Sequence, residues 1–291
     1  MSSVYQYFSE FISLNADRFE VLKKILSDFS VPYNIVSIAD SNHVFVTPDI
    51  SYALKNSGTC ILLAHYDRVA GSPGANDNSA AVFQLIEAAI KLHKERERNW
   101  LIIFTDKEEI LPNGSIRDQG SYGLAKIFYQ MGSQNGRFYI FDACGTGDTI
   151  LLSNTVDFLL KDKDGRGIDK IRTNIQKLRS EAFECARDNS IKKILLVPTP
   201  FSDDAGFLSA GIAAQTITVL PSNEAAEVAN MLRLKPQLSE LLIKKGKRHI
   251  NELPFIPQTW KRLNGPGDVE LFLTPQYYSQ IVRFAYALCK G

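Results

Sequence analysis

The chain has 291 residues, of which 45% are hydrophobic, so it can bury a large core in one or two domains. Its formal net charge of +1 gives no electrostatic reason to expect binding to nucleic acid or to an anionic membrane surface. The four cysteines lie far apart and form no CxxC pair, which argues against a zinc ribbon and against a disulfide framework.

The N-terminal residues MSSVYQYFSEFISL lack the basic start and the apolar run of a signal peptide, and no stretch is apolar over the length of a bilayer. We therefore expect a cytoplasmic protein. Residues 4–29 carry apolar side chains at helical spacing, with Asn15 and Asp17 as a break and a cap between two helical pieces. Residues 33–39 and 43–47 predict a hairpin, in which His43 has a structural role.

The middle of the chain alternates between strands and helices. Apolar runs predict strands at residues 60–64, 100–105 and 137–141, and helical periodicity predicts helices at 79–92 and 122–131. This order favours an α/β fold, a mostly parallel central sheet with helices on both faces. Further on, we expect helices at 169–187, 224–234 and 277–288 and strands at 194–197 and 213–220. No linker is visible, so residues 1–291 are predicted to form a single domain on which the N-terminal helices (1–30) pack.

Acidic residues and a histidine follow the predicted strands at the point where each ends. His65 and Asp67 follow the first strand, Glu108 and Glu109 the second, and Asp142 the third. Ligands of open α/β sheets bind beyond the carboxyl ends of the strands. Imidazole nitrogen and carboxylate oxygen are zinc ligands, and two zinc ions can share a bridging carboxylate. Each motif alone is weak, but the series favours a metal site.

Five segments carry a family resemblance: AHYD (64–67), GANDNSA (74–80), FTDKEE (104–109), FDACGTGD (141–148) and FSDDAGFLSAGIAA (201–214). In this order they resemble the co-catalytic di-zinc aminopeptidases of the aminopeptidase S and aminopeptidase Y type, to which animal glutaminyl cyclases are related. The GANDN passage is the most specific of the five. The resemblance implies a three-layer, zinc-exopeptidase-like fold and zinc as the cofactor.

The resemblance also implies a ligand set. His65 and Asp142 would bind one zinc ion, Glu109 would bind the other, and Asp77 would bridge both. The small residues around Asp77 would let the backbone wrap closely around it.

The remaining implied roles concern two further carboxylates. Asp67 would orient the His65 ring, as expected for a metal-bound histidine. Glu108 would be the general base that activates water for attack on a peptide carbonyl and later protonates the leaving amine.

The sequence departs from the family at its last ligand. The family has a histidine in a C-terminal segment that resembles HTPxD, whereas this chain has LNGPGD (263–268), with Asn264 at the histidine position. An asparagine carbonyl is a poorer zinc ligand than imidazole, so the second site is predicted to be weak and open to another divalent metal. Asp204, in SDD where relatives often have SDH, and His249, in a basic segment, are two candidates for replacing it.

The residues and the resemblance together predict a metal-dependent aminopeptidase that acts on peptides with a free N-terminus and binds one or two zinc ions. The alternative is a catalytically impaired or inactive family member that serves as a binding or scaffold protein with at most one metal. Glutaminyl cyclisation ranks last, because it uses the Asp, Glu and final His set that is broken here. We expect no nucleic-acid or membrane partner, and the sequence indicates neither the oligomeric state nor the substrate side chain.

Overall fold

The protein, analysed as a computed structural model, is described for residues 3–56, 58–110, 114–245, 253 and 256–290. Its strands are β1 (Tyr33–Ile38), β2 (Ser41–Val46), β3 (Cys60–His65), β4 (Trp100–Thr105), β5 (Arg137–Phe141), β6 (Thr149–Ser153), β7 (Ile194–Val197) and β8 (Gln215–Leu220). Within the described residues these strands form one sheet in the order β1-β2-β4-β3-β5-β8-β6-β7.

The parallel part of the sheet lies at its centre. Strand β3 pairs in parallel with β4 on one side and with β5 on the other, and β5 pairs in parallel with β8. Every residue of β3 and β4 is buried, as expected for strands covered on both faces. The hairpin β1–β2 adds to β4 in antiparallel fashion, and β6 is antiparallel to β8. The carboxyl ends of β3, β4 and β5 therefore meet at one edge of the sheet.

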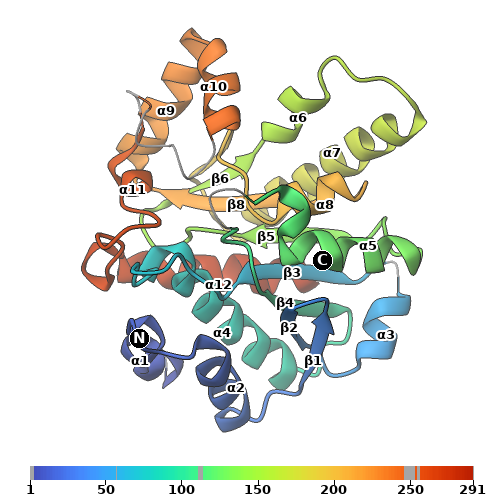
Figure 1. Cartoon of the computed structure of the whole chain (residues 1–291), viewed down its shortest axis with the longest axis vertical. Helices are drawn as coiled ribbons and strands as arrows, with labels where there is room; N and C mark the ends of the chain where they lie inside the picture. The colour runs from blue at the N-terminus through green and yellow to red at the C-terminus, as the bar shows by residue number, and fades with distance from the viewer. Residues whose placement is uncertain (1–2, 57, 111–113, 246–252, 254–255, 291) are drawn as a thin grey trace.

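Helices cover both faces of the sheet. The longer ones are α2 (Arg18–Asp28), α4 (Ala80–Lys94), α5 (Gly120–Gln130), α7 (Arg166–Asp188), α9 (Ser222–Leu234), α10 (Gln237–Lys245) and α12 (Pro275–Lys290). The short ones are η1 (Ser3–Tyr7), α1 (Phe8–Ile12), α3 (Ile50–Lys55), η2 (Ala75–Ser79), η3 (Ile116–Asp118), α6 (Thr155–Leu160), α8 (Asp204–Ser209), α11 (Gln258–Lys261) and η5 (Glu270–Phe272). Figure 1 shows α4 and α12 along one side of β3 and α5 along the other.

Alternate residues of the central strands point into two different cores. Leu62 of β3 and Ile102 of β4 lie in a cluster with side chains of α1, α2, α4, α7 and α12. Their neighbours Leu63 and Ile103 lie in a second cluster with α3, α5 and α8. This two-residue alternation makes three layers and confirms the predicted fold class.

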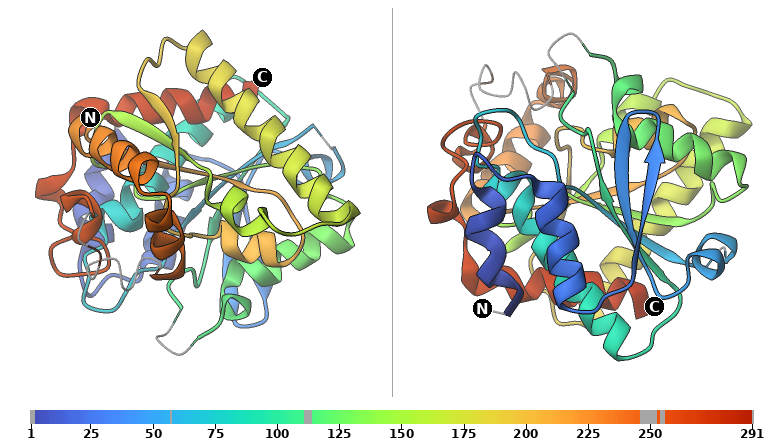
Figure 2. Two further views of the ribbon diagram at one scale, coloured as in Figure 1. Left: turned by 90° about the horizontal axis from the view of Figure 1, so that it is seen from above. Right: turned by 60° about the horizontal axis from the view of Figure 1, so that its bottom comes forward.

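The N-terminal helices pack on the first of these cores. Phe8 and Phe11 of α1 are fully buried and both contact the ring of Phe83 in α4. As the sequence predicts, Asp17 caps α2, where its side chain accepts the backbone N–H of Glu20 at 3.1 Å. Figure 2 shows α1 and α2 side by side next to the hairpin. None of the described helices is both long and apolar enough to span a membrane.

His43 is fully buried in β2, in the structural environment predicted for it. Its Nδ1 lies 3.3 Å from the backbone nitrogen of Asp106, and burial lowers the pKa of the imidazole from 6.5 to about 4. The unfolded chain therefore takes up a proton on His43 before the folded protein does. His43 therefore lowers the stability of the folded protein as the pH falls from 6.5 towards 4, by about 2 kcal/mol between pH 7 and pH 5.

We expect His43→Gln to raise the unfolding free energy at pH 5, relative to that at pH 7, by about 2 kcal/mol compared with the unaltered protein, as measured by urea denaturation at both pH values. His93→Gln, near the end of α4, is the matched control and should leave the difference between the two pH values unchanged. If His43→Gln also leaves this difference unchanged, burial does not lower the pKa of His43 in the way described.

Candidate metal centre

The predicted site residues converge at the carboxyl edge of the parallel strands. His65 is the last residue of β3, Asp142 directly follows β5, and Glu108 lies three residues beyond the end of β4. All three side chains are buried. The parallel pairing of β3 with both neighbours places these strand ends together, as the sequence predicts.

One cluster consists of His65, Asp77 and Asp142. Their ligand atoms lie within 4.8 Å of one another, and all three residues are buried. His65 Nε2 is 3.0 Å from Asp77 Oδ1 and 3.8 Å from Asp142 Oδ1. Two ligands of a tetrahedral zinc ion with bonds near 2.05 Å lie about 3.4 Å apart, between these two distances. This donor set of one imidazole nitrogen and two carboxylates therefore fits zinc.

Asp67 contacts the His65 ring at Nδ1, the nitrogen that faces away from Asp77. The Asp67 carboxylate lies 3.4 Å from His65 Nδ1 and accepts the backbone N–H groups of Glu108 at 3.2 Å and Glu109 at 2.9 Å. Burial disfavours the ionised form, but the hydrogen bonds from His65 and from these two N–H groups hold the pKa of Asp67 below its usual range. Asp67 thus fixes the histidine ring and the Glu108–Glu109 backbone together.

A second cluster consists of His65, Glu108 and Glu109, whose ligand atoms also lie within 4.8 Å of one another. Glu108 is buried and Glu109 is half-buried. Burial alone would lower the pKa of His65, but the surrounding carboxylates, with Glu108 first among them, raise it well above its usual value. The site therefore concentrates negative charge, which is the electrostatic setting that a divalent cation requires.

The turn that carries Asp77 depends on Gly74 and on two asparagines. Gly74 has a φ of +58°, and a Cβ there would lie 2.6 Å from the carbonyl oxygen of Asp77. Asn78 Nδ2 donates to the Phe141 carbonyl at 2.8 Å, and Asn76 Oδ1 accepts the Gly145 N–H at 2.7 Å. These bonds hold the turn against the end of β5, beside Asp142.

The C-terminal segment closes the site from the other side. The Asp268 carboxylate accepts the backbone N–H groups of Asn76 at 2.8 Å and Asp77 at 2.9 Å. Burial raises the pKa of Asp268 to about 7. Gly265, next to Asn264, accepts the Ser72 hydroxyl at 3.0 Å. These contacts place the LNGPGD segment against the Asp77 turn.

Asn264 lies in this segment in a left-handed conformation with a φ of +60°. Its Nδ2 atom is buried and makes no hydrogen bond within the described residues. The assignment of Asn264 as a metal ligand stays a prediction.

The structure describes only one of the two candidates for replacing the missing histidine ligand, Asp204 and His249. Asp204 begins α8, and its Oδ1 accepts the Ser202 N–H at 2.8 Å, while burial raises its pKa to about 7. Asp204 belongs to neither of the metal-capable clusters found among the described residues. His249 lies outside the described residues.

Sequence reasoning missed three residues around the centre: Asp203, Asp268 and Arg18. Asp203 is fully buried and accepts a hydrogen bond at 2.5 Å from the hydroxyl of Thr105, the last residue of β4. Its position next to Asp204 in the SDD motif was the signal that could have identified it. Asp268 was visible as the last residue of the HTPxD-like segment. Arg18 carries no motif at all.

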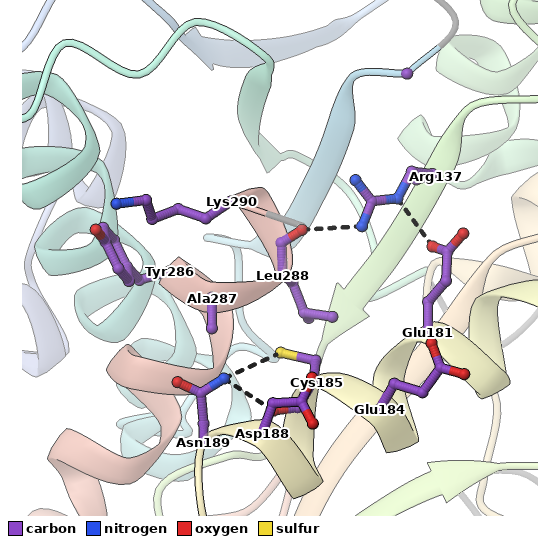
Figure 3. A pocket seen from close by; sticks show the side chains of 11 residues that line it. Arg137, Glu181, Glu184, Cys185, Asp188, Asn189, Tyr286, Ala287, Leu288 and Lys290 are labelled. Carbon is purple, nitrogen blue, oxygen red and sulfur yellow. Dashed lines mark hydrogen bonds and ion pairs between the residues drawn. The ribbon is translucent and has the colours of Figure 1, made fainter.

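Two cavities differ in their relation to this centre. The cavity in Figure 3, about 620 Å³, is lined by Arg137, Glu181, Cys185 and Lys290 among others. Arg137 is the first residue of β5, so this cavity lies at the sheet edge opposite Asp142. A second cavity of about 820 Å³ is lined by Glu109, Lys107, Arg117 and Gln119 among others and borders the centre.

A comparison with known protein families matches residues 49–230 to peptidase family M28. The chain belongs to this family. No curated protein sequence matches the chain. Family membership supports a metal-dependent hydrolase, and the matched range contains His65, Asp77, Glu108, Glu109 and Asp142 but neither Asn264 nor the N-terminal helices.

Solved structures with the same fold include three bacterial enzymes. A glutaminyl cyclase from Bacteroides thetaiotaomicron has a TM-score of 0.64 at 14% identity and covers 99% of this chain and 97% of its own. A Zn-dependent exopeptidase from Parabacteroides distasonis has a TM-score of 0.60 at 15% identity, with coverages of 98% and 94%. A zinc aminopeptidase from Bacillus subtilis has a TM-score of 0.52 at 15% identity. The match covers 85% of this chain but only 49% of that protein.

Proposed function

We propose that this member of family M28 is a zinc-dependent aminopeptidase that releases N-terminal residues from peptides in the cytoplasm. The observation that carries the proposal is the cluster of His65, Asp77 and Asp142, whose ligand atoms lie within 4.8 Å of one another beside buried Glu108. The cluster offers one imidazole nitrogen and two carboxylates, which are donors that zinc binds, and the carboxylate of Glu108 lies in a second cluster around the same imidazole.

The first cluster supports one set of ligand roles, in which His65, Asp77 and Asp142 would hold one zinc ion. The family resemblance adds a weaker second ion held by Glu109 with Asp77, and Glu109 lies in the other cluster, with His65 and Glu108. When bound, zinc supplies a Lewis acid for the substrate carbonyl and lowers the pKa of water. Asp67 keeps the His65 ring oriented so that Nε2 faces Asp77 and Asp142.

Glu108 moves the proton. Its carboxylate accepts a proton from the attacking water, whose oxygen forms a bond to the peptide carbonyl carbon. When the carbon–nitrogen bond breaks, Glu108 returns the proton to the leaving amine nitrogen. The adjacent cavity of about 820 Å³ lies within the usual size range of ligand pockets and borders Glu109.

The test is metal analysis of the purified protein followed by incubation with a peptide panel and added zinc, manganese or cobalt. Release of N-terminal amino acids from unblocked peptides but not from N-acetylated ones supports the proposal. The panel includes a peptide with N-terminal glutamine, so that loss of ammonia without hydrolysis would indicate cyclisation instead. A protein that binds metal and alters no peptide would favour the scaffold alternative.

A further inference from the structure

Arg18 is a buried cation that reaches the metal centre from the N-terminal helices. It is the first residue of α2, lies outside the residues matched to family M28, and is 5% exposed. Burying a guanidinium is unfavourable unless its N–H groups find acceptors. The Nε of Arg18 makes no hydrogen bond within the described residues, so the partners of its Nη1 and Nη2 atoms indicate why it is buried there.

Those partners all belong to one segment, the chain that runs from the end of β3 to the start of α4. Nη1 donates to the carbonyl oxygens of Tyr66 at 3.1 Å and Asp67 at 3.2 Å. Nη2 donates to the carbonyl oxygens of Pro73 at 2.6 Å and Gly74 at 3.2 Å. Nη2 also donates to the Ser79 hydroxyl at 2.8 Å. A single side chain thus joins the two ends of this segment.

The two ends of the segment carry the two ligands. His65 directly precedes Tyr66, and Asp77 lies three residues beyond Gly74. Asp268 holds the N–H groups of Asn76 and Asp77, whereas Arg18 holds the carbonyl groups that precede them. The C-terminal segment therefore fixes the backbone N–H groups of the Asp77 turn. The N-terminal helix α2 fixes the carbonyl groups at the start of the same turn.

We propose that Arg18 is a positioning residue for the metal centre: it sets the separation of His65 and Asp77 so that both can bind the same ion. This inference rests on the proposed metal site. The planar guanidinium is suited to the task because its N–H groups diverge in a fixed geometry, which a lysine ammonium does not reproduce. The ring of Phe11, whose centroid lies 4.8 Å from the guanidinium carbon, packs against the guanidinium and holds it in place.

Arg68 offers a matched control, because it too joins the N-terminal helices to the loop after β3. Arg18 reaches from a helix to the loop, whereas Arg68 reaches from the loop to a helix. It lies on the loop and donates to the carbonyl oxygens of Ile12 at 3.0 Å and Ser13 at 2.7 Å, at the end of α1. Arg68 also donates to the Pro73 carbonyl, but at 3.5 Å, against 2.6 Å for Arg18. Loss of Arg68 therefore loosens the docking of the N-terminal helices and removes this long contact but leaves the Arg18 contacts with the loop.

The experiment compares the full-length protein with Arg18→Lys and Arg68→Met. Zinc affinity is measured by competition with a chromogenic chelator, and the unfolding midpoint of each metal-free protein is measured by calorimetry. We expect Arg18→Lys to weaken zinc binding about 10- to 100-fold, as is typical when a residue that supports a ligand is lost. Arg68→Met should lower the unfolding midpoint but weaken zinc binding no more than about threefold.

Other outcomes would overturn the inference. If Arg18→Lys binds zinc like the unaltered protein, the contacts do not position the ligands. If the two variants weaken zinc binding equally, Arg18 acts only by docking the helices. These results leave the proposed metal site intact, whereas an unaltered protein that binds no zinc would remove both proposals.

Discussion

Glu108→Gln is expected to lower kcat for peptide hydrolysis by about 10²- to 10⁴-fold while zinc binding stays within a few-fold of the unaltered protein. The reason is that glutamine keeps the size of the side chain but cannot accept a proton from water. Glu108 lies in the buried cluster with His65, yet it is not part of the His65, Asp77 and Asp142 set. The measurement is steady-state hydrolysis of an unblocked peptide, together with a zinc titration of both proteins.

A suitable control is Glu184→Gln, which removes a carboxylate from the cavity in Figure 3, at the opposite edge of the sheet. It should leave kcat and zinc binding unchanged. If Glu108→Gln keeps full activity, the proton passes through another group and the proposed mechanism is wrong.

Asn264→His should strengthen binding of a second zinc ion by about tenfold or more, equivalent to about 1.4 kcal/mol or more. Imidazole is a better zinc ligand than a carboxamide, and histidine, like asparagine, is among the residues that tolerate a left-handed conformation such as the φ of +60° here. Chelator competition would be fitted to two sites, with the first site expected to keep its affinity.

Asn230→His, on the exposed side of α9, controls for the gain of an imidazole as such. It should leave both affinities unchanged. If Asn264→His also changes neither affinity, residue 264 does not face the second ion, and the alignment of the LNGPGD segment with the family pattern is incorrect.

The central strands could be predicted because they are continuous apolar runs. The predicted strands at residues 100–105, 137–141 and 194–197 coincide with β4, β5 and β7. Such runs end at polar loops, so their boundaries are visible in the sequence. The strand β6 was missed, since its apolar run is only ILL, one residue shorter than the ILLV of β7, and it directly follows the FDACGTGD motif.

His65 and Asp142 could be proposed as site residues because each lies where an apolar strand ends, and Asp77 was added by the family resemblance. The structure brings the three side chains together, and their role as metal ligands stays a prediction. Arg18 and Asp268 act instead on backbone groups. A carbonyl or an N–H group carries no sequence signature, and these partners lie 55 to 192 residues away along the chain. No local pattern could have predicted either contact.

The contact between Asn76 and Asp268 spans 192 residues, which has a consequence for synthesis of the protein. During translation, His65 and Asp77 emerge long before Asp268 is added to the chain. The turn that holds Asp77 cannot take its final form until residue 268 has left the ribosome, because two of its backbone donors lack their acceptor until then. Metal acquisition is therefore expected to be a late event, after the central sheet has formed.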